Sequence, residues 1–253
     1  MSRSVKISGV IITYNEEKNI ERCLNSLQTV CDEIVVVDSF STDRTKEICL
    51  QYAVNFIEHE FEGFTEQKNF ALDQCKFDKV LSLDADEALS DRLKTSILEA
   101  KEEWTADAFK FNRLTNYCGK WIKHGDWYPD TKVRLWNKKE GKWDGLNPHS
   151  SVHLNPRTIT QHLKGDLLHY SYYSMQEHIE RSIKYALISA EALKNQGKRS
   201  SLFKIIGSSS LRFLQDYILR LGFLEGVYGL VICTTNAYTT FLKYAYLREL
   251  NKE

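Results

Sequence analysis

The sequence predicts an α/β fold, in which a mostly parallel β-sheet carries helices on both faces and a C-terminal helical region follows. Two observations support this prediction. Short runs of β-branched residues alternate with helical spacing of apolar residues from residue 5 to residue 104, and repeats of this kind form parallel sheets with right-handed crossovers. After residue 172, apolar residues recur at helical spacing only, which predicts a helical appendage.

The first half of the chain supports this fold element by element. Strands are indicated by apolar runs rich in valine and isoleucine, and helices by apolar residues three and four positions apart. The expected order is strand Val5–Ile12, helix 20–27, strand Glu33–Asp38, a helix capped by Ser41 or Thr42, strand Val54–Ile57, helix Phe64–Cys75, strand Lys79–Leu83 and helix Asp91–Trp104.

Composition argues against several classes of function. The 34 lysines and arginines balance the 34 aspartates and glutamates, so the net charge is zero and we expect no nucleic-acid partner. The six cysteines contain no CxxC pair, which favours reduced thiols in the cytoplasm over structural zinc. The N-terminus lacks a secretory signal pattern, because strand Val5–Ile12 runs directly into polar residues.

Polar residues follow three of the predicted strands. The segments are Thr13-Tyr14-Asn15-Glu16, Asp38-Ser39 and Asp84-Ala85-Asp86. Because the carboxyl ends of parallel strands meet at one edge, where α/β folds bind ligands, we expect these segments to converge. In an extended chain Asp84 and Asp86 point to the same side, which suits one divalent cation, or a cation and a ribose. The alternative is an acidic helix start capped by Ser90.

The pattern indicates a nucleotide site without a glycine-rich phosphate loop. Neither GxGxxG nor GxxxxGK[ST] occurs in the sequence. Hydroxyl, amide and carboxylate side chains would then bind the base and the ribose, and a metal ion would bind the phosphates.

Together these motifs resemble the family 2 glycosyltransferases with the GT-A fold, a Rossmann-like fold of nucleotide-diphospho-sugar transferases. The resemblance rests on Ile12-Thr13-Tyr14-Asn15-Glu16, on residues 36–43, on Gln67-Lys68-Asn69 and on Asp84-Ala85-Asp86-Glu87. Further segments resemble the branch that includes the lipopolysaccharide-core β-glucosyltransferases: Trp127-Tyr128-Pro129-Asp130, residues 133–136, Asn147-Pro148-His149 and His169-Tyr170-Ser171.

The resemblance implies a nucleotide-sugar donor, a Mn²⁺ or Mg²⁺ cofactor and roles for individual residues. The nucleoside pocket would be lined by Thr13, Asn15, Glu16 and Asp38, with Asp38 accepting a hydrogen bond from the base. Lys68 would lie beside the diphosphate, Asp84 would face the ribose or the metal, and Asp86 would bind the metal. His169 matches a histidine that completes metal binding in some relatives; the alternative is a satisfied core histidine ending strand Gly165–His169.

The base that takes the acceptor proton is less clearly indicated. After Pro148-His149 the resemblance implies an acidic residue, but the chain has Ser150, which is not a base at neutral pH without a partner. The remaining candidates are Asp130, Asp126, Asp144 and His149. We favour Asp130, because an acid after Tyr128-Pro129 sits in a rigid turn; the alternative is a turn-forming aspartate.

Aromatic residues suggest an acceptor platform, because sugar rings stack on indoles. The cluster comprises Trp121, Trp127, Tyr128, Trp136 and Trp143, and the competing interpretation is hydrophobic core. Arg134 is a further candidate for acceptor or phosphate contact, or the outward residue of a strand. The His149/His153 spacing does not predict a second metal site, because no helical pattern surrounds it.

The C-terminal region, 173–253, begins with a capping box at Ser174-Met175-Gln176-Glu177. A broad apolar face runs from Leu202 to Leu221, with basic residues beside it. The uncharged run Gly226–Leu242 is short and contains threonines and an asparagine, so no membrane-spanning helix is expected. The region suits attachment to the inner face of a membrane; the alternative is packing on the catalytic domain or on a second subunit, as in a homodimer.

We therefore expect a cytoplasmic, metal-dependent inverting glycosyltransferase. The expected donor is a nucleoside diphosphate sugar, most simply a UDP-sugar. The expected acceptor is a saccharide or a lipid-linked saccharide of a surface glycan such as lipopolysaccharide. Its catalytic domain would span 1–172, with a nucleotide-binding half at 1–105 and an acceptor half at 106–172. The alternatives are a nucleotidyltransferase, which normally carries a glycine-rich loop, and a non-catalytic nucleotide-sugar-binding protein.

Overall fold

In a computed structural model, residues 4–145 and 150–252 of the chain are described. They form two compact units, Met1–Arg113 with Asp130–Tyr170, and Leu114–Pro129 with Ser171–Glu253. The sequence had assigned the segment 114–129 to the catalytic domain. In the structure it belongs to the C-terminal unit, because Tyr117 and Ile122 pack in one cluster with Ile232.

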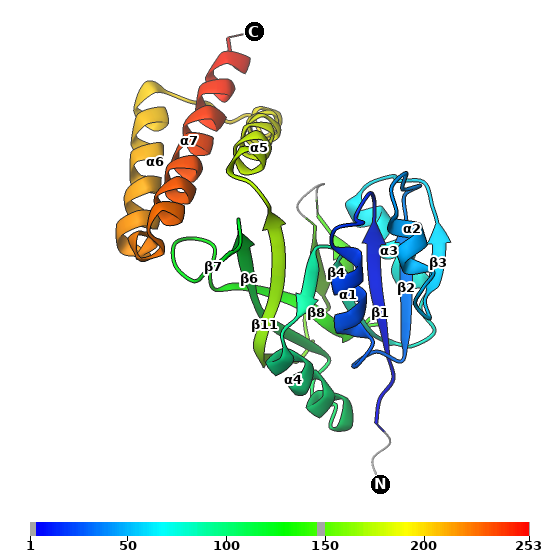
Figure 1. The fold of residues 1–253 in the computed structure, drawn as a ribbon. Helices are drawn as coiled ribbons and strands as arrows, with labels where there is room; N and C mark the ends of the chain where they lie inside the picture. The colour runs from blue at the N-terminus through cyan, green and yellow to red at the C-terminus, as the bar shows by residue number, and fades with distance from the viewer. Residues whose placement is uncertain (1–3, 146–149, 253) are drawn as a thin grey trace. The chain divides into compact units, whose positions relative to one another are not determined.

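The first unit is built on a parallel half-sheet, as the alternating pattern predicted (Figure 1). Its strands pair in parallel, with β1 between β2 and β4 and with β3 outside β2. Their bounds are β1 Ile7–Thr13, β2 Glu33–Asp38, β3 Asn55–Glu58 and β4 Lys79–Asp84.

The same sheet continues beyond β4 with antiparallel strands, which the sequence pattern did not predict. The order is β3-β2-β1-β4-β8-β6-β11-β5, with β7 paired to β6, and β9 and β10 form a separate two-stranded sheet. The bounds are β5 Glu87–Leu89, β6 Ala108–Tyr117, β7 Lys120–Ile122, β8 Asp130–Asn137, β9 Gly141–Asp144, β10 Ser151–Leu154 and β11 Thr160–Tyr172. The boundary between the two units falls within β6 and β11.

Helices cover both faces of the parallel strands. On one face, Ile7 and Ile11 of β1 pack with helices α1 (Ile20–Leu27), α2 (Thr45–Cys49) and α4 (Asp91–Glu102). On the other face, Val10 packs with α3 (Phe64–Asp73) and with Trp143 of β9. Consecutive strand residues point to opposite faces, so these strands are apolar throughout.

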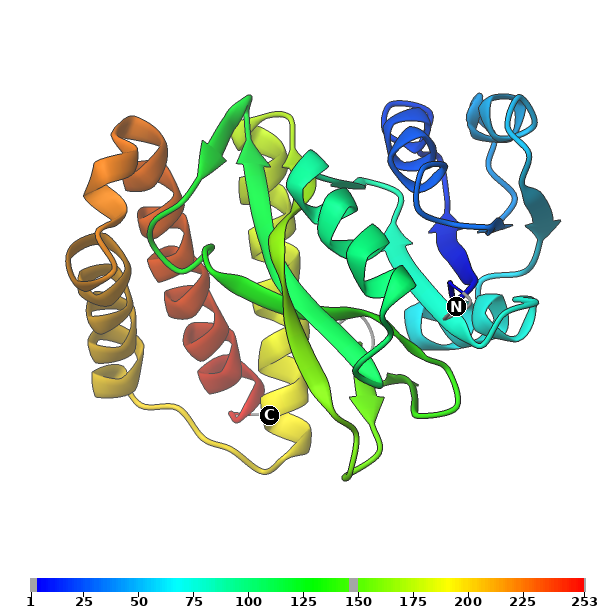
Figure 2. The same cartoon turned by 90° about the horizontal axis from the view of Figure 1, so that it is seen from below.

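The second unit is mainly helical. Its α7 lies between α5 and α6 in both Figure 1 and Figure 2. The bounds are α5 Met175–Asn195, α6 Leu202–Leu214, a π-helical turn η1 Gln215–Leu219, a 3₁₀ turn η2 Gly222–Glu225, and α7 Val227–Leu250. The sequence predicted one apolar helix face from Leu202 to Leu221. In the structure the α-helix ends at Leu214, a π-helical turn follows, and Leu221 adopts φ +59°. None of the helices in the described part is long and apolar enough to cross a membrane.

Candidate active site

The carboxyl ends of β1, β2 and β4 meet at one edge of the sheet, as predicted. Thr13 is the register partner of Asp38, and Ile12 is the partner of Asp84. Loops 13–17 and 38–45 leave this edge and are joined by hydrogen bonds. The Asn15 amide donates to Ser41 Oγ (2.8 Å), and the Thr42 amide donates to Asn15 Oδ1 (2.9 Å).

Asp38 is fully buried at the base of these loops. Its carboxylate accepts hydrogen bonds from Thr13 Oγ1 (2.7 Å), the Ser41 amide (2.7 Å) and Ser41 Oγ (2.6 Å). A carboxylate has about four acceptor positions, so three of them are used by the protein itself. These hydrogen bonds indicate that Asp38 orders the two loops. The resemblance implied that Asp38 contacts the nucleobase.

Other residues of these loops complete the network. The Glu16 amide donates to Thr45 Oγ1 (2.8 Å), and Glu16 Oε2 accepts from Asn19 Nδ2 (2.9 Å). Tyr14 and Phe40, which the sequence analysis did not select, project from the loops with 59% and 56% of their surface exposed. Phe40 adopts φ +60°, an uncommon conformation for a bulky residue.

Gln67, Lys68 and Asn69 connect α3 to three different parts of the site. Gln67 Nε2 donates to Ser39 Oγ (3.0 Å). Lys68 Nζ pairs with Asp84 Oδ1 (2.6 Å). Asn69 exchanges two hydrogen bonds with the backbone of Trp143, at 2.9 and 3.0 Å. Because Gln67 and Lys68 are buried, these polar contacts hold the helix in one position.

Asp84 lies between two cations. Lys68 contacts one oxygen, and Arg134 Nη2 lies 2.7 Å from the other. Burial by itself raises the pKa of Asp84, but the charges of Arg134 and Lys68 outweigh it and hold the pKa well below its usual range. Arg134 also contacts Glu87 Oε1 at 2.9 Å and is only 4% exposed. In this structure Arg134 is thus held by two carboxylates of the protein, and its contact with an acceptor stays a prediction.

The indole of Trp143 supports the same two cations. Lys68 Nζ lies 4.2 Å and the Arg134 guanidinium 5.2 Å from the ring centre, within the range of a cation–π attraction. Trp136 lies edge-on to Trp143, is fully buried, and donates its Nε1–H to the carbonyl of Gly141 (3.0 Å). Trp136 therefore packs in the hydrophobic core, and its predicted contact with an acceptor stays a prediction.

Asp130 is held in a charged cluster. Arg113 Nη2 lies 2.7 Å from one oxygen and Lys132 Nζ 2.8 Å from the other. Burial opposes its ionisation, but Arg113 and Lys132 lower the pKa of Asp130 below its ordinary value. A carboxylate with a lowered pKa is a weaker base, so this environment does not favour the predicted role.

Asp86 and His169 form a second pair at the end of β4. His169 Nε2 lies 3.2 Å from Asp86 Oδ2, and the Tyr170 amide donates to the Asp86 carbonyl (2.9 Å). The antiparallel pairing of β11 with β5 produces this contact, because His169 is the register partner of Glu87. The predicted metal residues are thus divided: Asp86 and His169 lie together, and Asp84 is engaged by cations.

The donor chemistry of Asp86 and His169 fits a hard divalent ion. Carboxylate oxygen and imidazole nitrogen are both ligands for Mn²⁺, and Mg²⁺ commonly takes one or two carboxylates with water and phosphate oxygens. Within residues 4–145 and 150–252, no three His, Cys, Asp or Glu side chains gather into a complete metal site. A metal held by Asp86 and His169 would take its remaining ligands from water or from a bound molecule.

The structure describes two of the three remaining base candidates, and each of them has protein partners. His149 lies outside the described residues. Asp126 is bound by Arg212 and Arg220 within the second unit. Asp144 is exposed, lies 3.9 Å from His153 and accepts from the Gly145 amide.

Trp127 belongs to an aromatic cluster of the second unit. It stacks on Tyr172 (5.6 Å, 26°) and lies edge-on to Tyr117 and His178. Tyr117 Oη lies 3.1 Å from His178 Nδ1, and burial lowers the pKa of His178 to about 4. The half-buried Trp127 thus packs within this cluster, and its contact with an acceptor stays a prediction.

Comparison with known proteins identifies relatives over nearly the whole chain. The family model "Glycosyl transferase family 2" matches residues 8–155. The lipopolysaccharide core biosynthesis glycosyltransferase LpsC of Rhizobium meliloti is 30% identical over 260 residues, covering 97% of this chain and 93% of that protein. The uncharacterized glycosyltransferase RT0209 of Rickettsia typhi is 34% identical over 257 residues, covering 97% and 88%.

Among solved structures, the mannosyltransferase PcManGT from Pyrobaculum calidifontis, in complex with GDP-Man and Mn²⁺, has a TM-score of 0.56. It is 15% identical and covers 100% of this chain and 89% of its own. A likeness at this identity concerns the fold alone, and it agrees with the predicted GT-A architecture.

Proposed function

Because this chain belongs to the family 2 glycosyltransferases, we propose that it transfers a sugar, with inversion, from a nucleoside diphosphate sugar to a saccharide acceptor of a surface glycan. The acceptor class is supported by LpsC, which acts in lipopolysaccharide core biosynthesis and aligns over nearly the whole chain. A lipid-linked saccharide acceptor is compatible with the same proposal. UDP is the first nucleotide to test.

The observation that carries the proposal is the arrangement at the end of β4. Asp86 and His169 lie 3.2 Å apart, and Lys68, Asp84 and Arg134 form an adjoining charged network. Asp86 and His169 would hold Mn²⁺ or Mg²⁺, which as a Lewis acid stabilises negative charge on a departing diphosphate. The divalent-cation requirement is further supported by PcManGT, whose complex contains Mn²⁺.

The protein's own residues would supply binding and positioning. Loops 13–17 and 38–45 are tied to each other by Asn15, Ser41 and Thr42, which keeps the exposed Tyr14 and Phe40 in fixed positions beside the strand ends. Aromatic faces stack with nucleobases, so these two residues are candidates for the base contact. Lys68, tied to Asp84, would place a positive charge next to the diphosphate.

The test is a thermal-shift screen of nucleotide sugars with and without Mn²⁺, followed by donor hydrolysis. A ligand that binds only the folded state raises the melting temperature. We expect the largest shift with UDP or a UDP-sugar plus Mn²⁺, and release of nucleoside diphosphate on incubation. Asp86→Ala should lose the metal-dependent part of the shift and roughly 100-fold or more of the hydrolysis.

Asp91→Ala is the matched control, because Asp91 is 99% exposed at the start of α4 and contacts only Lys94 among the described ion pairs. Equal shifts with and without Mn²⁺, or no shift with any nucleotide, would contradict the proposal. Release of pyrophosphate from a nucleoside triphosphate would instead identify a nucleotidyltransferase. Binding without turnover on any acceptor pool would identify a non-catalytic binding protein.

The base can be identified in the same assay with Asp130→Asn and His149→Ala. A histidine base with an ordinary pKa loses activity as the pH falls below about 6.5, whereas an aspartate with a lowered pKa stays active to below about pH 4. Because Arg113 and Lys132 hold Asp130, we expect His149→Ala to have the larger effect.

A further inference from the structure

The outward face of α6 is apolar. Leu202, Phe203, Ile206 and Leu211 are 59%, 92%, 61% and 67% exposed, while Ile205 between them is buried. A helix that packs on its own protein through one face normally carries charged or polar residues on the other. Here the exposed side carries the larger apolar residues, which marks it as a contact surface for something outside this unit.

Helix α5 of the same unit shows the ordinary pattern and serves as an internal comparison. Its exposed positions include charges of both signs, at Glu180, Arg181, Lys184 and Glu191. The exposed apolar residues of α5, Ile179, Tyr185 and Leu187, are 36–42% exposed and lie among these charges, whereas those of α6 are more exposed.

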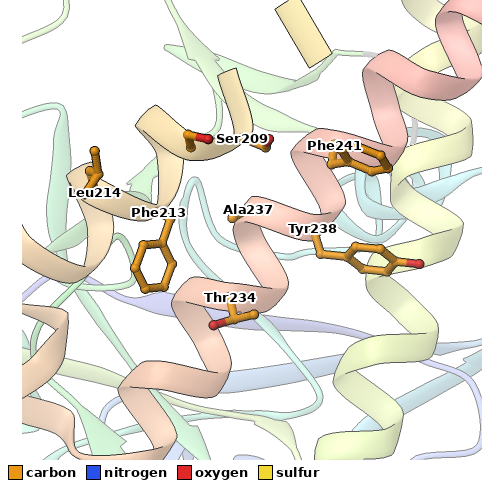
Figure 3. A pocket seen from close by; sticks show the side chains of 8 residues that line it. Ser209, Phe213, Leu214, Thr234, Ala237, Tyr238 and Phe241 are labelled. Carbon is orange, nitrogen blue, oxygen red and sulfur yellow. The ribbon is translucent and has the colours of Figure 1, made fainter. Parts of the chain in front are cut away.

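The apolar surface extends beyond α6. At the turn that leads into α7, Leu219, Leu224 and Val227 are 77%, 53% and 70% exposed. A groove of about 510 Å³ runs between α6 and α7, with Phe213 on one wall and Phe241 on the other (Figure 3). The outward face of α6, this turn and the groove together are called the α6–α7 surface below.

The accessible charges within residues 198–248, beside the α6–α7 surface, are of one sign. From Lys194 to Arg248 the sequence contains only two carboxylates, Asp216 and Glu225. Both are buried and already paired, Asp216 with Arg212 and Arg220, and Glu225 with Lys120. Four cations, at Lys198, Arg199, Lys204 and Lys243, enter no ion pair within the part of the chain that the structure describes.

We propose that the α6–α7 surface binds the surface of a bilayer that contains anionic lipids. The apolar side chains of α6 would enter the interface while the helix lies in its plane, and the four cations would face the anionic headgroups. A second copy of this chain fits less well, because neither of the two carboxylates within residues 198–248 is accessible to pair with those cations. The inference goes beyond the proposed function and does not depend on it.

The test is co-sedimentation of the full chain with vesicles, in the absence of donor and metal. We expect binding to vesicles of phosphatidylcholine with one quarter phosphatidylglycerol, weaker binding to pure phosphatidylcholine, and a loss of the difference at high salt. Leu211→Asp should weaken binding about tenfold or more. Leu187→Asp is the matched control: Leu187 is 42% exposed on α5, so the same substitution there should leave binding unchanged.

Circular dichroism and donor hydrolysis of Leu211→Asp should equal those of the unchanged protein, which separates loss of attachment from loss of folding or activity. Binding that is equal for both vesicle types, or equal for Leu211→Asp and the unchanged protein, would overturn the proposal. So would a dimer in sedimentation equilibrium that Leu211→Asp dissociates while vesicle binding is absent, since the occupant would then be a second copy.

Discussion

At the scale of single residues, Asp84 neutralises two buried cations. It contacts Lys68 and Arg134, which are 7% and 4% exposed. Removing one partner of a buried pair leaves an uncompensated charge, which is more costly than losing the attraction itself. The first acid of the Asp84-Ala85-Asp86 motif is therefore as much a structural residue as a ligand-binding one.

Asp84→Asn should lower the free energy of unfolding by on the order of 2 kcal/mol, measured by urea denaturation at pH 7. Asp78→Asn is the control, because Asp78 forms an exposed pair with Lys139, and such pairs contribute about 0–1 kcal/mol. If the two variants were equally stable, the buried network would not have the role assigned to it.

At the scale of elements, Gly165 sets the approach of β11 to α4. Its φ is +106°, and a Cβ at this position would lie 2.4 Å from the backbone nitrogen of Leu93. No side chain fits there without displacing the start of α4. Gly207 in α6 differs, because nothing lies within 4 Å of an added Cβ.

Gly165→Ala should therefore destabilise the protein by roughly 2–3 kcal/mol, and Gly207→Ala should stabilise it by about 0.5–1 kcal/mol, because alanine loses less backbone entropy in a helix. Melting temperatures of the two variants should move in opposite directions. A lower melting temperature for Gly207→Ala would show that α6 does not have its helical conformation in solution.

At the scale of the whole molecule, stability should fall in two steps as the pH is lowered. Burial lowers the pKa of His178 from 6.5 to about 4, so the unfolded chain binds a proton that the folded chain does not, and stability is lost as the pH falls from about 6.5 to about 4. Asp84, whose pKa is also lowered, adds a loss below about pH 4, through the same relation.

The first step amounts to at most roughly 3 kcal/mol and can be measured by urea denaturation at pH 7.5, 6.0 and 5.0. His178→Gln should remove this dependence of the free energy of unfolding on pH, because no titrating group then remains at that position. His153→Gln is the control, since the side chain of His153 is 61% exposed. An unchanged pH dependence in His178→Gln would contradict the assignment.

The sequence by itself determined the parallel half of the fold and the edge at which ligands would bind. The segments Glu33–Asp38 and Lys79–Asp84 are short, largely apolar runs that end in an aspartate, and this pattern depends only on local residue type. The family followed from the same segments, because their combination is specific even where each motif is weak. The capping box at Ser174 was likewise readable, and Ser174 Oγ accepts from the Glu177 amide at 3.1 Å.

Tertiary structure alone decided which polar residues bind one another. The partners of Asp84 are Lys68 on α3 and Arg134 on β8, 16 and 50 positions away, and nothing local distinguishes them from surface lysines and arginines. The sequence likewise left open whether Trp136 and Trp143 form a platform for a sugar or belong to the core. In the structure both side chains pack in a core cluster. A side chain's type is a local property, but its burial and its partners depend on which distant strands pair, and the electrostatics of this site follows from those pairings.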